Sequence, residues 1–536
     1  MAALTLGKIG TDKQIGSLAR MLHENDDKDP YLRHAGIMGL AGIMAKRRVT
    51  FELYLPHIRK KSTAVRLAYV AAARRNRQPL IGEFLSDPEP AVVKEAARAV
   101  HDLPMRSSFG KLASLIKDDP QDDAVVRRVL NANMIRGGED NALQLAKFAS
   151  RPNNDLERRN DALELLRNWE NPKPRDYVLG DWRPVRGDRN VEFARVALEK
   201  FFGRISSKSP VAAKTVEVCA ELNCKIDLKK LATFASETSS AEPLRIASLK
   251  ALSKLDPEKH QEIVVQLSST LDELPDELST VVIEQLVSQD KQKAIDVLQK
   301  VVESDSASVL RKQLSYKTLG GIDGDRTAEI LSSSLDRLAK GEIESSVALD
   351  LMMASEKRSE ASVKDRLGKT DDESNKYKFV LEGGNAERGS KIFYEKTEVY
   401  CTRCHLIDDW GGAVGPELSE IGKQKDRKYL LQSIIDPNGV IAEGFNQTIV
   451  LTEDGETFTG IKKDEDDSVL TLMDKDGKLI RVEKDIIEGQ KEGKSSMPED
   501  LIKHLSKSEL RDVIEFLASR KEKKSSKSGE ANTEHK

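Results

Sequence analysis

The sequence predicts a mainly α protein in two parts: an α-solenoid over residues 1–355, then a smaller helical domain over residues 380–522. Three observations support this fold class. Short amphipathic patterns recur about every 30 residues in the first part, the hydrophobic period changes from helical to alternating near residues 445–483, and helical patterns return after it. The 536-residue chain is also too long for a single hydrophobic core. We therefore expect the second domain to carry an inserted antiparallel β meander.

The first part repeats one unit, which opens with a Pro, Asp or Ser turn and continues with a basic residue and then small and apolar residues at helical spacing. The basic residues are 28 to 33 positions apart and comprise Arg33, Arg66, Lys94, Arg127 and Arg158. A period near 30 residues with two short helices per unit is typical of a solenoid, in which each unit is stable only against its neighbours. The unit resembles the HEAT repeat, and this resemblance implies a binding scaffold.

Three features of the first part leave alternatives open. The Pro-, Arg- and Trp-rich insert at residues 168–190 is expected to form a loop that either binds a partner or packs back onto the helices. Cys219 and Cys224 are either small buried side chains in a reducing compartment or a local disulfide in an oxidising one. The histidines are too scattered to hold a metal and are expected to be surface or hydrogen-bonded helix residues: His23, His34, His57, His101 and His260.

Residues 356–379 are polar and charged without a sustained apolar face, which predicts a linker. We therefore expect residues 380–522 to fold without the solenoid. The last residues, 523–536, are rich in Lys, Ser and Glu and are expected to form a disordered tail.

Local signals place the helices at the start of the second domain. Asn385 is a cap for a helix that begins at Ala386. A helix over residues 427–435 should end at Asp436-Pro437, because the residue before a proline is disfavoured in helical conformation.

The inserted meander and the last helix have signals of their own. Residues 445–483 contain about four segments rich in β-forming residues, and Asp-Gly pairs at 454–455 and 476–477 favour tight hairpin turns. Ser506 and Glu509 form a capping box for the last helix.

The segment VYCTRCHLID contains Cys401, Cys404 and His405 within five positions, in a chain with only two other cysteines. A zinc site needs a second Cys or His pair, but the rest of this domain contains no cysteine and one histidine, His504. A thioredoxin-like redox pair belongs at a helix N-terminus within a βαβ unit, which the surrounding sequence does not show. Covalent haem attachment uses all three residues: both thiols add across the haem vinyl groups, and His405 is placed to reach the iron as proximal ligand. The sequence therefore predicts one covalently bound haem c.

The sixth iron ligand must come from elsewhere in the chain. Met497 lies in a Ser-Ser-Met-Pro loop outside regular backbone pairing, as expected of a loop-borne thioether ligand. Met473 competes but falls in a predicted strand, and His504 competes but lies on a predicted helix beside Leu501 and Leu505. We expect Met497 to be the distal ligand, with His504 or an open site as the alternatives.

The order of helix, Cys-x-x-Cys-His, Gly-Pro loop, helix, Met-Pro loop and capped C-terminal helix resembles a class I c-type cytochrome. More narrowly, four segments resemble the haem-binding domain of Planctomycetes–Verrucomicrobia-type multidomain proteins: GNAERGSKIF, CTRCH, GPELSEIGKQKDRKYLLQSIIDPNGVIAEGF and MPEDLIKHLSKSELRDVIEFL. In those proteins HEAT-like repeats precede a cytochrome with a β insert between its two axial ligands. Larger relatives carry an N-terminal β-propeller similar to sugar dehydrogenases, so the resemblance implies that this chain accepts electrons.

Composition and chemistry point to different compartments. The 86 basic and 89 acidic side chains nearly cancel, so no net charge attracts nucleic acid, and no apolar run is long enough to span a membrane. The first residues lack a secretory signal, which taken alone indicates the cytoplasm. Covalent haem attachment belongs outside the cytoplasmic membrane, so we expect a periplasmic or extracytoplasmic protein whose N-terminus is incomplete in this sequence.

The leading hypothesis is an electron-transfer protein without catalytic activity of its own, in which haem iron cycles between the ferric and ferrous states. The solenoid would dock a redox partner, such as a periplasmic dehydrogenase or a terminal acceptor. One alternative is a haem enzyme or sensor that binds peroxide or a small gas at an open distal site. The other is a non-redox interaction scaffold.

Overall fold

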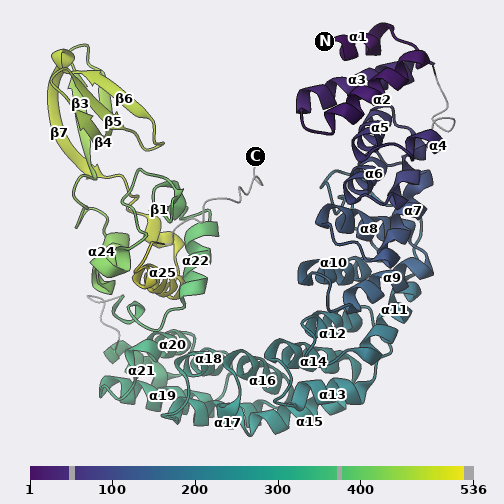
Figure 1. The fold of residues 1–536 in the computed structure, drawn as a ribbon. Helices are drawn as coiled ribbons and strands as arrows, with labels where there is room; N and C mark the ends of the chain where they lie inside the picture. The colour runs from purple at the N-terminus through teal and green to yellow at the C-terminus, as the bar shows by residue number, and fades with distance from the viewer. Residues whose placement is uncertain (48–54, 371–376, 524–536) are drawn as a thin grey trace. The chain divides into compact units, whose positions relative to one another are not determined.

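The computed structural model describes residues 1–47, 55–370 and 377–523. Within these residues the chain is mainly helical with a small antiparallel sheet, which confirms the mainly α fold class (Figure 1). Contacts divide the chain into two compact units, Met1–Ser269 and Thr270–Lys536.

The expected disordered tail lies outside the described residues from residue 524 onward. Among the helices of the described ranges, none is long and apolar enough to cross a membrane.

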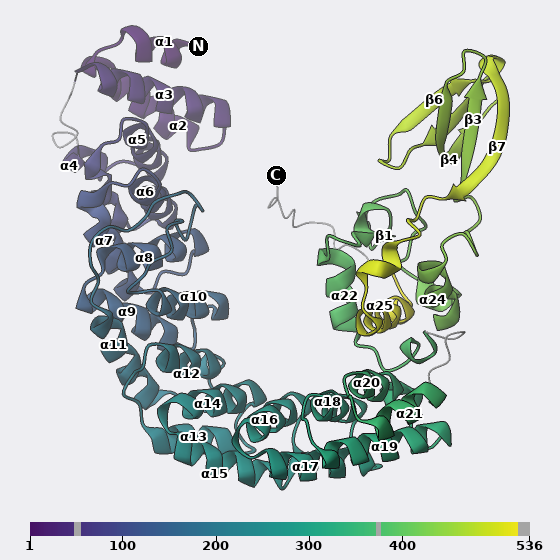
Figure 2. The same cartoon turned by 180° about the vertical axis from the view of Figure 1, so that it is seen from behind.

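The first unit consists of short helices. Their bounds are α1 Ala2–Ile9, α2 Ile15–Asn25, α3 Pro30–Arg47, α4 Leu55–Ile58, α5 Thr63–Arg75, α6 Pro90–Asp102, α7 Phe109–Ser114, α8 Asp123–Arg136, α9 Glu139–Ser150, α10 Leu156–Arg167, α11 Val191–Arg204, α12 Ala212–Glu221, α13 Leu228–Ser236, α14 Glu242–Leu255 and α15 Pro257–Ser268. Helix α5 packs on α6, α6 on α8, α8 on α9, and α12 on α14 (Figures 1 and 2). Each helix therefore buries its apolar side against helices that are close to it in sequence.

The basic residues of the repeated unit join neighbouring helices through ion pairs. Arg66 in α5 donates to both carboxylate oxygens of Asp87 at 2.9 and 3.0 Å, and both side chains are buried. Lys94 in α6 donates to Asp122 at 2.8 Å, and the Asp122 carboxylate also caps α8 by accepting from the Val125 N–H. In both cases the base reaches the turn that precedes the next helix of the pattern. This contact accounts for the basic residue in these two units.

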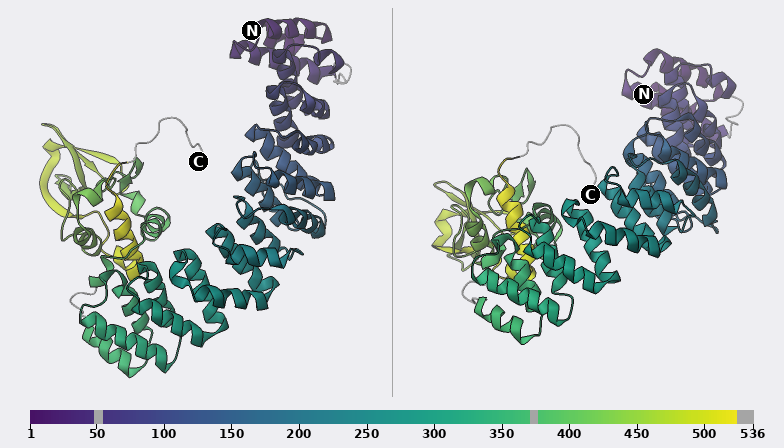
Figure 3. Two further views of the ribbon diagram at one scale, coloured as in Figure 1. Left: turned by 60° about the horizontal axis from the view of Figure 1, so that its bottom comes forward. Right: turned by 90° about the horizontal axis from the view of Figure 1, so that it is seen from below.

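The second unit begins with helices that follow the same pattern: α16 Asp276–Gln289, α17 Lys291–Glu303, α18 Val309–Leu319, α19 Asp325–Ala339, α20 Ser345–Glu356 and α21 Ala361–Thr370. Four further helices follow, α22 Ala386–Glu395, α23 Ile421–Gln424, α24 Arg427–Ile435 and α25 Lys507–Ser519. Helix α25 lies between α22 and α24 in Figures 1 and 2, and it is the yellow helix in both views of Figure 3.

The segment expected to be a polar linker is partly helical. Helix α21 packs against α19 and α20, and its Val363 is fully buried. The Arg358 guanidinium, also buried, donates to the carbonyl oxygen of Ile322 at 2.5 Å. Because these contacts fix residues 358–370 against the preceding helices, the structure differs here from the expected linker. Residues 371–376 lie outside the described residues.

The core of the second domain is shared with helix α20. Leu349 of α20 is buried in the same hydrophobic cluster as Phe393 of α22 and Ile514 of α25. Arg511 of α25 donates to Asp350 of α20 at 2.5 Å, and both side chains are largely buried. A fragment that starts at residue 380 would expose this face of the cluster, so the structure argues against the expectation that this domain folds without the helices before it.

Five strands form the inserted sheet, in the order β6-β5-β4-β3-β7. Their bounds are β3 Asn446–Thr452, β4 Thr457–Glu465, β5 Val469–Met473, β6 Leu479–Glu483 and β7 Ile487–Ser495. The first four match the predicted meander, and β7 extends the sheet beyond its predicted end. The β7 sequence IEGQKEGKS has no alternation of apolar residues, because this edge strand buries little and pairs only with β3.

Candidate cofactor site at the Cys-x-x-Cys-His segment

The three predicted cofactor residues lie on one tight turn of backbone. Tyr400 has a left-handed conformation, with φ of 37°, and is followed by a 3₁₀ turn over Cys401–Arg403. The N–H groups of Cys404 and His405 both donate to the carbonyl oxygen of Cys401, at 3.2 and 3.0 Å. The backbone of all three residues therefore belongs to one turn.

The His405 ring is held through one nitrogen only. Its Nδ1 lies 2.9 Å from the carbonyl oxygen of Pro416, which only accepts, so Nδ1 carries the proton of the neutral ring. The other nitrogen, Nε2, makes no hydrogen bond to any residue that the structure describes. Burial lowers the pKa of His405 and outweighs the opposite effect of the Pro416 carbonyl. The result is a neutral imidazole whose Nε2 lone pair is available to a metal.

A glycine-rich loop is packed tightly against this imidazole. A Cβ atom on Gly415 would lie 2.7 Å from Cε1 of His405. At this distance the loop or the imidazole ring would have to move to make room for it. The Gly415 N–H donates to the Cys404 carbonyl at 2.6 Å, and the Gly412 N–H donates to the Thr402 carbonyl at 2.9 Å. The loop thus forms a cradle that only a residue without a side chain at position 415 allows.

Strands β1 (Leu406–Ile407) and β2 (Trp410–Gly411) form a short hairpin directly after the imidazole. Its two-residue turn has left-handed backbone at Asp408 and Asp409, with φ of 50° and 66°. Such a turn matches the twist of a hairpin, and aspartate tolerates it better than most residues. The hairpin reverses the chain direction after His405, so that the following loop can place Gly415 against the imidazole ring.

All four cysteines are free thiols. Cys401 is partly buried against the hydrophobic core of the domain. Burial raises the pKa of Cys401 to about 11 and also raises the pKa of Cys404. Both groups are therefore protonated thiols at neutral pH. Cys219 and Cys224, the other pair, are buried in the first unit, and the Cys224 N–H donates to the Cys219 carbonyl at 2.9 Å.

Met497 lies in an irregular segment after β7, as predicted. Its N–H donates to the Ser495 hydroxyl at 3.1 Å, and its partly buried side chain packs on the same core cluster as Cys401. Met473 is the last residue of β5, in agreement with its predicted strand. His504 ends a 3₁₀ turn over Leu501–His504 and its side chain is exposed. Of the candidate sixth ligands, Met497 packs on the same core as Cys401.

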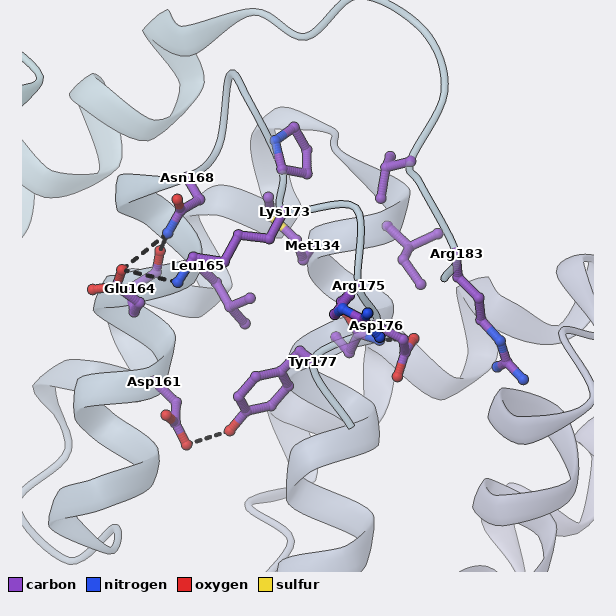
Figure 4. A pocket seen from close by; sticks show the side chains of 14 residues that line it. Met134, Asp161, Glu164, Leu165, Asn168, Lys173, Arg175, Asp176, Tyr177 and Arg183 are labelled. Atoms are coloured by element: carbon purple, nitrogen blue, oxygen red, sulfur yellow. Dashed lines mark hydrogen bonds and ion pairs between the residues drawn. The ribbon is translucent and has the colours of Figure 1, made fainter. Parts of the chain in front are cut away.

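The insert at residues 168–190 forms the second site of interest, because it encloses a cavity of about 120 Å³ in the first unit (Figure 4). The polar lining of this cavity includes Asp161, Glu164, Asn168, Lys173, Arg175 and Tyr177. Asp161 accepts from the Tyr177 hydroxyl, and Glu164 accepts from Asn168 at 3.1 Å and from Lys214 at 3.0 Å. The carboxylates of Asp161 and Glu164 therefore already have hydrogen-bond or ion-pair partners within the protein.

The insert largely packs back onto the helices, which was one of its two predicted roles. Trp169 is fully buried, its Nε1 donates to the Asn190 carbonyl at 3.2 Å, and the Arg189 guanidinium lies 4.4 Å from its ring centroid. Trp182 is 69% exposed. The first tryptophan anchors the insert, while the second remains on its surface.

The insert is also held by a buried histidine, His101 of α6, whose side chain is 1% exposed. Its Nδ1 lies 3.0 Å from Asp102, and its Nε2 lies 3.4 Å from Asp176 of the insert. Burial lowers the pKa of His101, but hydrogen bonds and charge from Asp102 and Asp176 outweigh it, so the pKa is raised. Arg128 also pairs with Asp102, at 2.9 Å. The sequence alone gave His101 no such role, because Asp176 is 75 positions away.

Attachment of the insert is expected to weaken as pH rises. A folded-state pKa above the unfolded value means that the protonated ring stabilises the fold fully below about pH 6.5 and loses this effect as pH rises through the folded pKa. Amide hydrogen exchange of residues 174–185, corrected for intrinsic rates, should therefore accelerate as pH rises above about 6.5. His101→Gln should cost about 2–3 kcal/mol locally and remove this pH dependence. An unchanged pH profile in that variant would contradict the assignment.

No family model matches this chain, and a search of curated proteins found no match. The family resemblance of the motif segments therefore stays a prediction. Function is inferred below from the side chains of the site and from their surroundings.

Proposed function

We propose that this protein is a c-type cytochrome that carries single electrons on one haem bound covalently through Cys401 and Cys404. The observation that carries the proposal is the state of His405, one position after the second thiol. Its Nδ1 is fixed by the Pro416 carbonyl at 2.9 Å, and its Nε2 has no partner among the described residues. A neutral imidazole oriented through one nitrogen is the form that binds a metal through the other.

Each residue of the site would have a distinct role. Haem, when bound, supplies a one-electron ferric/ferrous couple. Cys401 and Cys404 would hold it through two thioether bonds, and His405 Nε2 would be the proximal ligand. Met497 would be the distal ligand, which its packing on the same core as Cys401 supports. The close approach of Gly415 to the imidazole would keep the ring oriented and exclude water from it.

The two other chemistries of a Cys-x-x-Cys pair fit the site less well. Reactive disulfide-exchange pairs have at least one thiol with a lowered pKa, whereas burial raises the pKa of both thiols here. For zinc, the described residues contain no group of three His, Cys, Asp or Glu side chains placed to hold a metal ion. Covalent haem attachment, in contrast, uses both thiols and His405.

We also propose that the two sets of helices, α1–α15 and α16–α21, are HEAT-like arrays that dock a redox partner. Packing between near neighbours in sequence, and the ion pairs of the recurring basic residue, support this. The partner would be a dehydrogenase or a terminal acceptor in the periplasm, where covalent haem attachment takes place. The chain would transfer electrons without catalytic activity of its own.

Replacing Cys401 and Cys404 together by serine is expected to abolish covalent haem attachment, because no thiol would remain to add to the vinyl groups. The full chain should be produced in a host that exports it and attaches haem. Acid–acetone extraction should leave the pigment on the unaltered protein and remove it completely from the double variant. Cys219→Ser with Cys224→Ser is the matched control, since it removes the other two thiols, and it should keep the pigment. Pigment that extracts from the unaltered protein would overturn the proposal.

A further inference from the structure

The inserted sheet contacts both segments that carry candidate iron ligands. It lies in sequence between His405 and Met497. Neither the Cys-x-x-Cys-His motif nor the helices of the domain assign it a function. One corner of the sheet is the turn between β5 and β6, at residues 474–478. The other is the end of β7, from which the chain continues directly to Met497.

The turn between β5 and β6 is closed by hydrogen bonds to a side chain. The carboxylate of Asp474 accepts from the N–H groups of Asp476 and Lys478, at 2.9 and 2.8 Å. Gly477 has φ of 80°, the left-handed conformation that this turn requires. The side chain of Asp476 is therefore presented outward from a fixed backbone.

The sheet contacts the cofactor segment through an ion pair from this turn and a hydrogen bond from β4. Asp476 accepts from Arg403, the residue directly before Cys404, at 2.5 Å. Lys463 of β4 donates to the carbonyl oxygen of Ala413 at 3.3 Å. Val414 of the glycine-rich loop is 3% exposed, and a Cβ on Gly477 would lie 3.9 Å from it, an ordinary contact distance. The sheet is thus joined to the cofactor segment at Arg403 and to the glycine-rich loop at Ala413.

The opposite corner holds the segment of Met497. The N–H of Ser495, the last residue of β7, donates to the Asn438 side chain at 2.9 Å. The Ser495 hydroxyl accepts from the Met497 N–H, and Gln447 of β3 donates to the Ser496 hydroxyl at 2.9 Å. Antiparallel ladders join β3 to β4, β4 to β5, and β3 to β7, and the last two of these ladders contain register shifts. Motion of the turn would therefore be transmitted to the segment that carries the thioether.

We propose that the sheet is a positioning element for iron ligation, and that the Arg403–Asp476 ion pair is the contact that fixes it. The inference rests on the proposed function. A thioether on an irregular segment would remain an iron ligand only while that segment is held in place. The Arg403–Asp476 ion pair would limit movement of the sheet relative to the cofactor segment. Asp476 and Arg403 are thus positioning residues, remote from the iron in the chain but coupled to the Met497 bond.

Charge reversal tests the pair. In the haem-loaded full chain, Asp476→Arg and Arg403→Asp should each raise the rate of cyanide binding to ferric haem about fivefold at low ionic strength. This factor is near the upper end for an exposed pair, and both side chains here are about half exposed. Each variant should also weaken the far-red absorption band of Met-ligated ferric haem. The double reversal should restore both readouts, and added salt should reduce the effect of either single variant.

The sheet offers a matched control at its other Asp-Gly turn. Asp454 is exposed between β3 and β4 and makes no contact with the cofactor segment in the described structure. Asp454→Arg introduces the same charge change and should alter neither cyanide binding nor the far-red band. If the single reversals behave like this control while haem stays covalently bound, the positioning role is overturned and the proposed function stands.

A second readout does not depend on haem. In the haem-free Cys401→Ser and Cys404→Ser chain, adding Asp476→Arg should accelerate amide hydrogen exchange at residues 411–415 and 495–499 by a similar fewfold factor. Exchange that rises only at the turn itself would also overturn the inference, because it would show that the two corners of the sheet are not coupled.

Discussion

Replacing Met497 by alanine is expected to leave haem covalently attached but without its sixth protein ligand. Ferric haem should then lose the weak far-red band of Met ligation and bind cyanide readily, and ferrous haem should bind carbon monoxide. The reason is that Met497 alone among the candidate ligands lies in an irregular segment that packs on the same core as Cys401. Absorption spectra of the purified protein, with and without added cyanide, measure this directly.

Replacing Met497 by histidine tests how the chemical nature of the sixth iron ligand affects the haem while a ligand is still present. The haem should stay six-coordinate and low-spin, but its midpoint potential should fall by on the order of 0.1 V or more, within the roughly 0.8 V range that axial ligands span. A thioether is soft and neutral and favours ferrous iron, whereas imidazole stabilises ferric iron. Potentiometric titration of the full chain gives the shift.

Met473→Ala and His504→Ala are the controls for this experiment. Met473 lies in β5 and His504 is exposed, so neither substitution should alter the spectrum or the potential. Suppose instead that Met497→Ala leaves both unchanged. The electron-transfer proposal would then lose its sixth ligand, and a haem enzyme or sensor with an open distal site would become the better proposal.

Local signals predicted the elements of the second domain well, because each depends on chemistry within a few residues. The Asn385 side chain accepts from the Arg388 N–H at 2.8 Å and caps α22, as its position suggests. Ser506 and Glu509 form the predicted capping box on α25. Helix α24 ends at Ile435, directly before the Asp-Pro pair.

Elements that depend on distant contacts were not predicted. Helix α21 has one fully buried apolar residue, Val363, and otherwise reads as a polar linker, so its helical state follows from packing on α19 and α20. Strand β7 is polar after its first residue, Ile487, and is a strand because β3 offers it a free edge. In both cases tertiary contacts outweigh weak local preference.

The candidate site divides in the same way. Cys401, Cys404 and His405 are adjacent in the chain, so their spacing alone identified them. The Pro416 carbonyl that fixes the His405 ring is 11 positions away, and only its Gly-Pro context suggested a functional loop. The Arg403–Asp476 pair spans 73 positions and carries no sequence signal, since both residues read as ordinary surface charges.

The crossing of α22 and α25 is the contact on which the second domain depends. Gly389 of α22 faces the backbone of α25, and a Cβ there would lie 1.9 Å from the carbonyl oxygen of Asp512. The Asp512 carboxylate accepts from the Asn385 N–H and from Arg388, both at 2.7 Å. Next to the crossing, the rings of Phe393 and Phe516 contact each other in a tilted arrangement, with centroids 5.5 Å apart and an interplanar angle of 52°. The backbones of the two helices therefore lie in direct contact. This close contact allows Asp512 to bind the first turn of α22 and the two phenylalanine rings to meet.

Gly389→Ala is expected to destabilise this domain by about 3 kcal/mol or more, because the added methyl group meets backbone that has no room to move without separating the helices. Hydrogen exchange of α25 should accelerate accordingly, and in the haem-loaded protein the far-red band of Met ligation should disappear at a lower temperature. Gly368→Ala makes the same change in helix α21, where nothing lies within 4 Å, and should instead stabilise that helix by up to about 1 kcal/mol. Equal effects of the two substitutions would show that helix propensity, and not the α22–α25 crossing, governs the response at Gly389.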